Sequence, residues 1–449
     1  MTTPSRAFAT YALTQSVFSD SAYDAAKTFI LDTLGVGIAG ANAPFRDTVG
    51  SVAASWGEGS GATVFGTNAS VPPATAAYLN GFQIHSMEYD CVHEPAVVHP
   101  MATVFAAISS EAQRRGVTTG FELMEAVIVG VDVAVELGVA VSSPLKFFRP
   151  ATAGLFGATL GIARLRGFDE ATALSAMGCA LAQVAGVMQA HLEGKPTLPV
   201  QIAGAARAAV VACDLAEAGL HGPEAALEGP AGYFAMFEDE ADAQAAAKRL
   251  GRVHRITEVS WKPFPTGRAA QGGITLVQAL REQGVRAENL ESLTLSAPPI
   301  IPRLVDRPAT LGMSPNYARL CFPWLGALTL VEGTVELSHF TREQLDDPEL
   351  HRLAARIRVD TNDVTDPAEF VPQSATATLA DGSTRLALAP RLFGSPAFPL
   401  TREQHLAKFR ACIAFGLRGV NADAVAARLI ETVDQLERLD DVQDLYRHR

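Results

Sequence analysis

The sequence predicts a mainly α-helical protein with a smaller mixed α and β domain, and three observations carry this prediction. Long stretches between about residues 21 and 220 repeat apolar residues at the three- and four-residue spacing of amphipathic helices. Short β-branched segments follow after about residue 260, and the helical spacing returns after Pro399. We therefore expect an all-helical domain built from residues 1–265 and 400–449, with an inserted α/β lid domain over residues 266–399.

The helices expected in the first part of the chain are rich in small residues. Several end at a glycine of the C-cap type, and their predicted ranges are 21–41, 101–115, 120–141, 151–166, 169–190 and 203–218. Three glycines within one of them, Gly154, Gly157 and Gly161, should each cost roughly 1 kcal/mol relative to alanine. We expect close approach between buried helices to offset this cost.

The expected lid domain consists of short strands and one helix. LESLTLSAP, RIRVDTN and SATATLADGSTRLALAP have strand character, and Asp381-Gly382 favours a hairpin turn. A helix is expected over residues 269–283. After Pro399, TREQHLAKFRACIAFGL and NADAVAARLIETVDQLERL begin with capping residues and continue with helical spacing. We expect these last helices to rejoin the first bundle.

Composition and charge exclude several classes of protein. A chain of 449 residues with 48% hydrophobic and 19% charged residues is typical of a soluble enzyme. The formal net charge of −12 argues against a nucleic-acid partner or an acidic membrane surface. The five cysteines are scattered without a CxxC pair, which indicates reduced thiols. The N-terminus shows no apolar leader segment, so we expect a cytoplasmic protein with no membrane association.

One polar stretch, NGFQIHSMEYDCVHEPAVVHP, stands out from a chain dominated by small apolar residues. A metal site could use its three histidines, His85, His93 and His99, with Glu88 or Asp90 as an oxygen ligand. Histidines six and eight residues apart do not share a helix face, so the spacing matches no ligand motif. We therefore expect no bound metal.

Two other interpretations of this stretch remain open. In the first, His85 and Asp90 cap helices and satisfy backbone donors without any catalytic role. In the second, the stretch is an acid–base site in which His93 and His99 lie beside Glu88 and Asp90, because an imidazole near a carboxylate can take or give a substrate proton.

The polar stretch also resembles a segment of the MmgE/PrpD family that runs roughly N-G-x-x-x-H-x-x-D-[FY]-D-D-x-H-x-x-x-x-x-H-P. LDTLGVGIAGA, GLHGP, GYFAMF and WKPFPTGR resemble further motifs of that family, in the expected order and over most of the chain. Members of the family include 2-methylcitrate dehydratase, cis-aconitate decarboxylase and iminodisuccinate epimerase. The resemblance implies chemistry on a small polycarboxylate without metal or cofactor, a helical domain with an α/β lid, and a homodimer.

The resemblance also implies roles for individual residues. His99 matches the conserved histidine before the last proline of the motif and Lys262 matches a lysine in a KPYP-like motif, so we expect these two to transfer protons. Glu88, which stands where an aspartate is usual, or Asp90 would orient the histidine. Cationic and polar groups would gather the substrate carboxylates, and the expected set is Arg149, Arg268, His93, Lys146 and Tyr89. Lys146 and Lys195 could instead be solvated surface charges.

Departures from the family pattern favour one of its reactions. Val92 replaces a frequent threonine, Arg149 a histidine, Leu198 a lysine, Gly267 a histidine or cysteine, and Trp324 a tyrosine. Dehydration needs an acid for the hydroxyl as well as a base, whereas epimerisation next to a carboxylate needs only a base, a proton donor and cations. We therefore expect an epimerase of an aminopolycarboxylate such as iminodisuccinate. The alternatives are a hydro-lyase or decarboxylase of a citrate-like acid, and an inactive binding protein.

Overall fold

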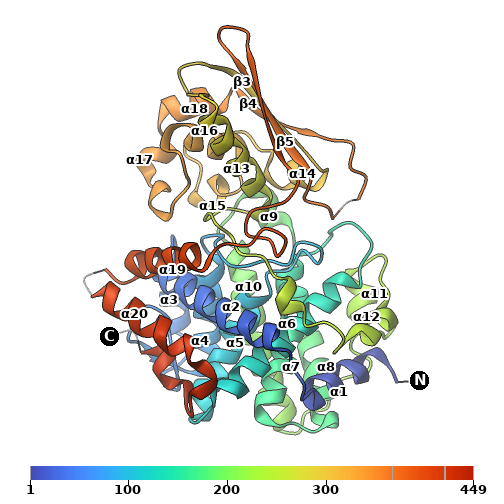
Figure 1. Ribbon diagram of the computed structural model, residues 1–449. Helices are drawn as coiled ribbons and strands as arrows, with labels where there is room; N and C mark the ends of the chain where they lie inside the picture. The colour runs from blue at the N-terminus through green and yellow to red at the C-terminus, as the bar shows by residue number, and fades with distance from the viewer. Residues whose placement is uncertain (1, 367, 419–420, 448–449) are drawn as a thin grey trace.

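The computed structural model describes residues 2–366, 368–418 and 421–447 and shows a large helical region beneath a smaller region that holds a sheet (Figure 1). The architecture is mainly α with an α+β part, as the sequence predicts. The last two long helices, α19 (Arg402–Gly416) and α20 (Ala422–Asp434), pack on α2 (Asp20–Ala39) near the start of the chain. Both ends of the chain therefore contribute to the helical region.

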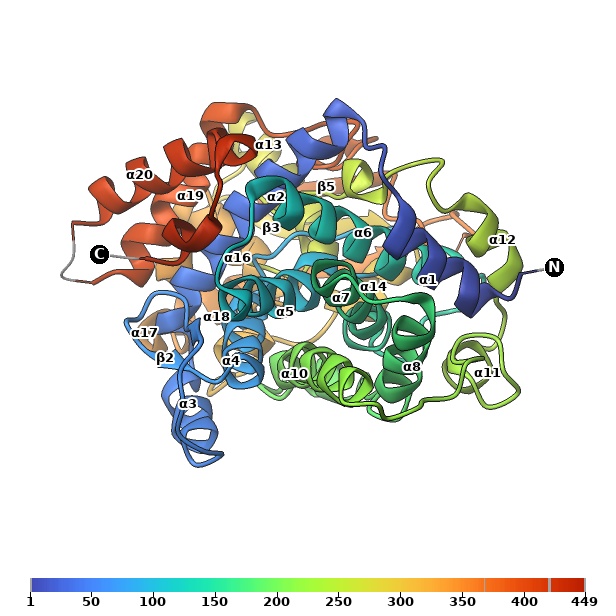
Figure 2. The same ribbon diagram turned by 90° about the horizontal axis from the view of Figure 1, so that it is seen from below.

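The helical region is a bundle whose central helices lie side by side when the molecule is seen from below (Figure 2). Besides α2, α19 and α20 it contains α1 (Pro4–Thr14), α3 (Arg46–Ala54), α4 (Pro73–His85), α5 (Pro100–Arg115), α6 (Gly120–Val139), α7 (Arg149–Arg166), α8 (Glu170–Leu181), α9 (Gln189–Glu193), α10 (Leu198–Glu217), α11 (Tyr233–Phe237) and α12 (Ala243–Arg249). Shorter elements are η1 (Gly40–Asn42), η2 (Arg255–Glu258), η4 (Leu436–Arg438), η5 (Val442–Tyr446) and the strands β1 (Ala62–Thr63) and β2 (Ser70–Val71).

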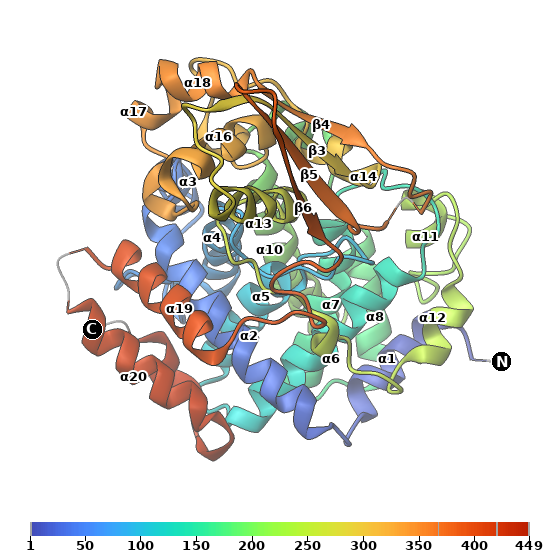
Figure 3. The ribbon, with the colours of Figure 1, turned by 45° about the horizontal axis from the view of Figure 1, so that its top comes forward.

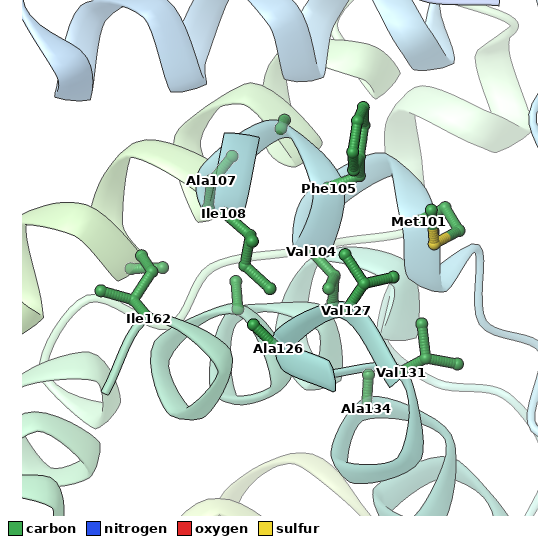
Figure 4. Packing of buried hydrophobic residues seen from close by; sticks show 14 of the residues in the cluster. Met101, Val104, Phe105, Ala107, Ile108, Ala126, Val127, Val131, Ala134 and Ile162 are labelled. Atoms are coloured by element: carbon green, nitrogen blue, oxygen red, sulfur yellow. The ribbon is translucent and has the colours of Figure 1, made fainter. Parts of the chain in front are cut away.

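Glycines let the central helices approach closely, as expected. A Cβ atom on Gly157 of α7 would lie 2.3 Å from the carbonyl oxygen of Gly130 in α6. A Cβ atom on Gly161 would lie 2.4 Å from the side chain of Ile108 in α5. Figure 4 shows Ile108 and Ile162 among the apolar side chains gathered between these helices. Burial of this core, at roughly 25 cal/mol per Å² of apolar surface, offsets the low helix propensity of glycine.

Two expected helices differ from the structure. The helix expected over residues 169–190 ends at Leu181, and an irregular segment precedes α9. In that segment Gly186 has a φ of 159°, and its carbonyl accepts a hydrogen bond from the Phe148 backbone N–H. The helix expected from Ala203 begins at Leu198, with a proline in its first turn where no N–H donor is needed. Helix α10 is long and apolar enough to span a membrane by length and composition alone. In the structure, 61% of the 18-residue stretch that meets this criterion is buried inside the protein.

The region that holds the larger sheet is here called the lid region. Its strands β3 (Leu290–Ala297), β4 (Ile357–Thr361), β5 (Gln373–Leu379) and β6 (Thr384–Ala389) form a sheet in the order β4-β3-β5-β6. β3 and β4 are parallel and the other neighbours are antiparallel. The expected hairpin turn joins β5 to β6, and Gly382 there has the positive φ of 81° that favours glycine.

Helices cover one face of this sheet (Figure 3). Of the lid helices, α13 (Arg268–Glu282), α14 (Ile300–Val305) and α16 (Phe322–Glu332) contact the strands. The other helical elements of the lid region are α15 (Pro315–Ala318), α17 (Arg342–Leu345), α18 (Pro348–Ala354) and the short η3 (Leu337–His339). The core beneath them includes Phe322 and Trp324, both fully buried. This core is separate from that of the bundle, so each region has its own hydrophobic interior.

One segment of the lid region, residues 303–319, docks on the bundle through a repeated type of contact. Five side chains donate hydrogen bonds to backbone carbonyl oxygens of the bundle's loops and short helix α9: Arg303 to Leu145 (2.7 Å), Arg307 to His191 (3.2 Å), Ser314 to Gly194 (3.1 Å), Asn316 to Ser86 (3.4 Å) and Arg319 to Met87 (3.0 Å). We call residues 303–319 the docking segment. It places the lid region directly over the polar stretch singled out in the sequence.

Candidate active site

The polar stretch connects α4 to α5 in a backbone conformation that ordinary loops rarely adopt. His85 is the last residue of α4, and α5 begins at Pro100. Between them Glu88 and Val97 have φ values of 51° and 52°, in the left-handed region that costs a non-glycine residue roughly 1–3 kcal/mol. Backbone hydrogen bonds between residues 92 and 260 tie this stretch to the segment that leads to Lys262. The fold thus holds these side chains in fixed positions.

Asp90 is the centre of the side-chain cluster that results. Its Oδ2 atom lies 3.0 Å from Nδ1 of His85 and 3.0 Å from Nδ1 of His99. An ionised carboxylate can only accept hydrogen bonds, so both imidazoles donate through Nδ1 and present Nε2 away from Asp90. The two rings are nearly perpendicular, with centroids 5.0 Å apart. Asp90 itself is fully buried.

Lys262 lies behind this cluster and pairs with its second carboxylate. Its Nζ atom is 2.9 Å from Oε2 of Glu88, 3.2 Å from the Glu88 carbonyl oxygen and 3.8 Å from Oδ1 of Asp90. The ammonium group is completely buried. Glu88 also places Oε1 3.6 Å from Nε2 of His85. Two carboxylates, two imidazoles and one ammonium group therefore share one enclosed space.

The two histidines have opposite electrostatic environments. Burial lowers the pKa of His99, and the positive charge of Lys262 lowers it further. For His85 burial also opposes protonation, but the charges of Asp90 and Glu88 together raise its pKa. Lys262 and the histidines hold the pKa of Glu88 at about 2, against the effect of burial. The cluster therefore places His99, whose lowered pKa suits it to act as a base, beside His85, whose raised pKa suits it to act as an acid.

A cavity of about 60 Å³ opens beside these groups. Its polar lining residues are His85, Glu88, His99, His191 and Arg268. The rest of the wall is apolar or lacks a side chain: Val92, Val97, Leu145, Phe148, Pro150, Met188, Leu198, Gly267, Ala269, Leu304, Val305, Leu320 and Phe370. Residues 267–370 belong to the lid region and the others to the bundle. The cavity therefore lies between the two regions, with the Asp90 cluster on the bundle side.

Two of the residues expected to bind substrate lie away from this cavity. Arg149 is buried and paired with Glu238, with Nε–Oε1 and Nη2–Oε2 distances of 2.9 and 3.2 Å. Lys146 is exposed, and its Nζ atom lies 2.8 Å from a carboxylate oxygen of Asp239. Neither side chain lines the cavity. Arg149 was expected to hold a substrate carboxylate, but the structure pairs it with an internal one that lies 89 residues further along the chain.

The other three expected binding residues have mixed positions. Arg268 lines the cavity, while its Nε atom donates to Glu94 at 2.7 Å. His93 faces away: its Nε2 atom is 3.1 Å from Glu258, and its Nδ1 atom accepts a backbone hydrogen bond within the polar stretch. Tyr89 packs in a separate apolar cluster, with a lysine of α19 over its ring and its hydroxyl donating to a backbone carbonyl. Arg268 alone of these three reaches the cavity.

The sequence did not identify several groups at the site. His85 was considered only as a helix cap or a metal ligand, yet it shares Asp90 with His99. His191 lines the cavity with its Nε2 atom buried and without a partner, and burial together with Arg307 lowers its pKa to about 4. Arg307 and Arg319 belong to the docking segment, where the sequence carries no recognisable motif. The available signal was that His85 matches the first histidine of the family motif.

A metal ion would find one group of candidate ligands among the described residues. His85, Asp90 and His99 each offer an atom within 4.8 Å of the other two, whereas His93 stands apart. In the present arrangement both Nδ1 atoms donate to Asp90, so these two nitrogens are not available to an ion. The absence of a metal stays a prediction.

Two family models together match most of the chain. The MmgE/PrpD N-terminal domain matches residues 6–246, and the MmgE/PrpD C-terminal domain matches residues 264–435. The chain belongs to the MmgE/PrpD family. The resemblance seen in the polar stretch and in WKPFPTGR is thereby confirmed, and the Asp90 cluster is the part of this MmgE/PrpD protein where both motifs meet.

Named relatives of this MmgE/PrpD protein include two mammalian enzymes. Cis-aconitate decarboxylase of Mus musculus is 26% identical over 444 residues, which cover 94% of this chain and 88% of the relative. Cis-aconitate decarboxylase of Homo sapiens is 25% identical over 465 residues, covering 98% and 92%. The cis-aconitate decarboxylase-like protein oryM of Aspergillus oryzae is 24% identical over 384 residues, covering 80% of each. The similarity to the mammalian enzymes extends over nearly the full length of both chains.

Proposed function

We propose that this protein is a lyase that removes carbon dioxide or water from a small carboxylic acid. The observation that carries the proposal is the pair of histidines on Asp90, one with a lowered and one with a raised pKa, which line the same cavity. A base and an acid held side by side can serve two neighbouring atoms of one substrate. The similarity to cis-aconitate decarboxylases supports the same class of reaction.

The two histidines would divide the proton transfers between them. In a dehydration, Nε2 of His99 takes the proton from the carbon next to a carboxylate, the electron pair forms the double bond, and the C–O bond breaks as Nε2 of His85 protonates the departing hydroxyl. In a decarboxylation, the C–C bond breaks, its electron pair moves toward a neighbouring carboxylate as an enolate, and His85 returns a proton to carbon. Asp90 holds both rings in the required tautomer.

The position of Lys262 weighs against the epimerase expected from the sequence. A two-base epimerase needs proton-transfer groups on opposite faces of one carbon, and His99 and Lys262 were the expected pair. Lys262 is fully buried, is not among the cavity's lining residues, and is bonded to both the side chain and the backbone of Glu88. We therefore assign it to the second layer of the site, where it sets the charge of Glu88 and lowers the pKa of His99.

One observation still favours an epimerase as the second candidate. Leu198 and Gly267 line the cavity at positions where the family resemblance places lysine and histidine or cysteine in the lyases. A reaction without a leaving group would need fewer polar residues there. An inactive binding protein is the third candidate, since it would need no acid or base at all.

Proton NMR in deuterated water separates the three candidates. The purified protein is incubated with cis-aconitate, 2-methylcitrate, iminodisuccinate and a set of simple dicarboxylic acids. A lyase produces a new alkene or a product shortened by one carbon, an epimerase exchanges a proton for deuterium without either loss, and a binding protein leaves every spectrum unchanged. Exchange alone, or no reaction with any acid, would refute the lyase proposal.

Two variants locate the activity. His99→Asn should reduce kcat by roughly 10²- to 10⁴-fold, the usual contribution of a general base. Lys146→Ala is the matched control, because this exposed side chain lies outside the cavity and should change neither kcat nor KM. A large rise of KM in Lys146→Ala would show that Lys146 takes part in substrate binding.

A further inference from the structure

The charged side chains that line the cavity are already neutralised by each other. The Arg268 guanidinium is paired with Glu94, whose oxygen lies 2.7 Å from Nε. Any positive charge on His85 is balanced by Asp90 at 3.0 Å, and His99 and His191 have lowered pKa values and are neutral. The remaining lining charge, Glu88, is balanced by Lys262 at 2.9 Å. The cavity wall therefore offers no net positive charge to a substrate.

Two arginines behind the wall supply positive charge that no acid balances. Arg307 donates to the carbonyl oxygens of His191 and Leu304, and Arg319 to those of Met87 and Pro265. Neither has an acidic partner among the described residues, and each lies over an aromatic ring instead. Arg307 bonds to two residues that line the cavity, and Arg319 directly precedes the lining residue Leu320. This pair can compensate two negative charges of a bound molecule.

The wall also contains two N–H groups without a hydrogen-bond acceptor. Nε2 of His85, which lies 3.6 Å from Oε1 of Glu88, and Nη2 of Arg268 are buried without a hydrogen bond, although both residues line the cavity. A buried donor without an acceptor is unfavourable, so these two N–H groups are suited to receive oxygen atoms of a ligand. Nε2 of His191 is likewise free, but a neutral imidazole adds no charge. Lys195 lines the smaller neighbouring cavity together with Leu198, but it is exposed to solvent, which screens its charge.

The rest of the wall is suited to an apolar group. Leu145, Phe148, Met188, Leu198 and Phe370 line the cavity, and Leu198 also lines the smaller neighbouring cavity beside His85 and Glu88. A third carboxylate against these side chains would lose its hydration without gaining a cation, which is strongly unfavourable. An alkyl group in the same place would instead bury apolar surface.

We propose that the substrate is a dicarboxylic acid that carries a small alkyl group where cis-aconitate carries its third carboxylate. The inference rests on the proposed lyase function for the reaction, but the charge count and the wall that carry it do not depend on which bond is broken. Arg268 receives one carboxylate through Nη2, His85 stays available as the acid, and the leucine and phenylalanine side chains receive the alkyl group.

Two acids of the same shape test this directly. In isobutylmaleate an isopropyl group stands where cis-aconitate has a carboxylate, and the other two carboxylates are unchanged. Isothermal titration calorimetry with the whole protein should show binding of isobutylmaleate on the order of tenfold or more tighter than that of cis-aconitate. Equal binding, tighter binding of cis-aconitate, or binding of neither acid would overturn the proposal.

Two variants of Leu198 test whether the apolar wall causes the preference for isobutylmaleate. Leu198→Lys adds a cation beside His85 and Glu88 and should reverse the order of the two acids, whereas Leu198→Met keeps an apolar side chain and should keep the order. An unchanged order in a folded Leu198→Lys protein, checked by circular dichroism, would contradict the assignment of the alkyl group to this wall.

Calorimetry measures binding and proton NMR measures turnover. Failure of the lyase proposal can therefore be distinguished from failure of the proposed substrate class. If isobutylmaleate binds more tightly than cis-aconitate but proton NMR shows no loss or addition of water or carbon dioxide, the lyase function fails and the substrate class stands. If cis-aconitate is both bound more tightly and converted, the lyase function stands and the substrate class fails.

Discussion

Replacing Asp90 with asparagine would test the shared carboxylate at the centre of the site. An amide has one acceptor atom and one donor group, whereas Oδ2 of Asp90 accepts from both His85 and His99 at 3.0 Å. If the amide nitrogen faces the histidines, both imidazoles must present a lone pair at Nδ1 and carry the proton on Nε2, so His99 can no longer act as a base. If the amide oxygen faces them, the NH₂ group lies near Lys262, which is 3.8 Å from Oδ1 in the wild type.

Either arrangement should have a large effect on activity and stability. Loss of a positioned acid and base reduces kcat by roughly 10²- to 10⁴-fold, equivalent to about 2.7–5.4 kcal/mol in the barrier. Because Asp90 is fully buried, removing its charge from the cluster should lower the free energy of unfolding by roughly 3–5 kcal/mol. The pKa of His85 should fall, since the charge of Asp90 is the largest influence that raises it.

Three measurements check this prediction. Steady-state kinetics give kcat, urea unfolding gives the free energy, and long-range ¹H–¹⁵N spectra of labelled histidines report the tautomer and pKa of each ring without any substrate. Asp239→Asn is the control, because it removes an exposed carboxylate from a surface ion pair and should change stability by less than about 0.5 kcal/mol. An Asp90→Asn protein with kcat within tenfold of the wild type and unchanged histidine tautomers would show that Asp90 is not the organising group.

Four further predictions follow from packing and electrostatics. Gly157→Ala should destabilise the bundle by roughly 1–3 kcal/mol in urea unfolding, whereas Gly204→Ala, with open space around its helical site, should stabilise it by up to about 1 kcal/mol; equal effects would contradict the close approach. Glu88 and Asp90 have lowered pKa values in the folded state, so their stabilising contribution is present above the unfolded values near 4 and is lost as the pH falls toward 2. Acid unfolding followed by circular dichroism measures this loss. In Glu88→Gln the stability should depend less on pH over the same range. Cys91→Ser should retain most activity, because burial raises the pKa of this thiol and keeps it protonated; a loss beyond about a hundredfold in a folded protein would contradict this. Elemental analysis should find no stoichiometric metal, and a zinc, iron or manganese ion removed together with activity by a chelator would refute that expectation.

Much of the fold follows from local sequence patterns. The spacing of apolar residues located α5, α6, α13, α19 and α20 closely, because amphipathic helices in a large bundle must place one face in the core. Asp381-Gly382 identified the hairpin for the same local reason. The break after α8 was not predicted, because its cause is the pairing of Gly186 with Phe148, a contact that no local pattern encodes.

The active site was harder to predict than the fold. The motif residues Glu88, Asp90, His99 and Lys262 do come together, because the backbone ties the polar stretch to the segment before Lys262. Which cations remain available to a substrate depends on ion pairs between distant residues. Arg149 is paired with a glutamate 89 residues away and does not line the cavity, and nothing near Arg149 in the sequence indicates that partner.

The docking segment has a consequence for how such a protein can diverge. Its five side chains recognise backbone carbonyl oxygens, which are the same whatever residue carries them. Substitutions at the accepting positions leave the acceptors in place as long as the backbone keeps its path. The contact between the lid region and the bundle therefore does not depend on which side chains surround the cavity. Selection can alter the wall that meets the substrate without having to rebuild the contact that closes over it.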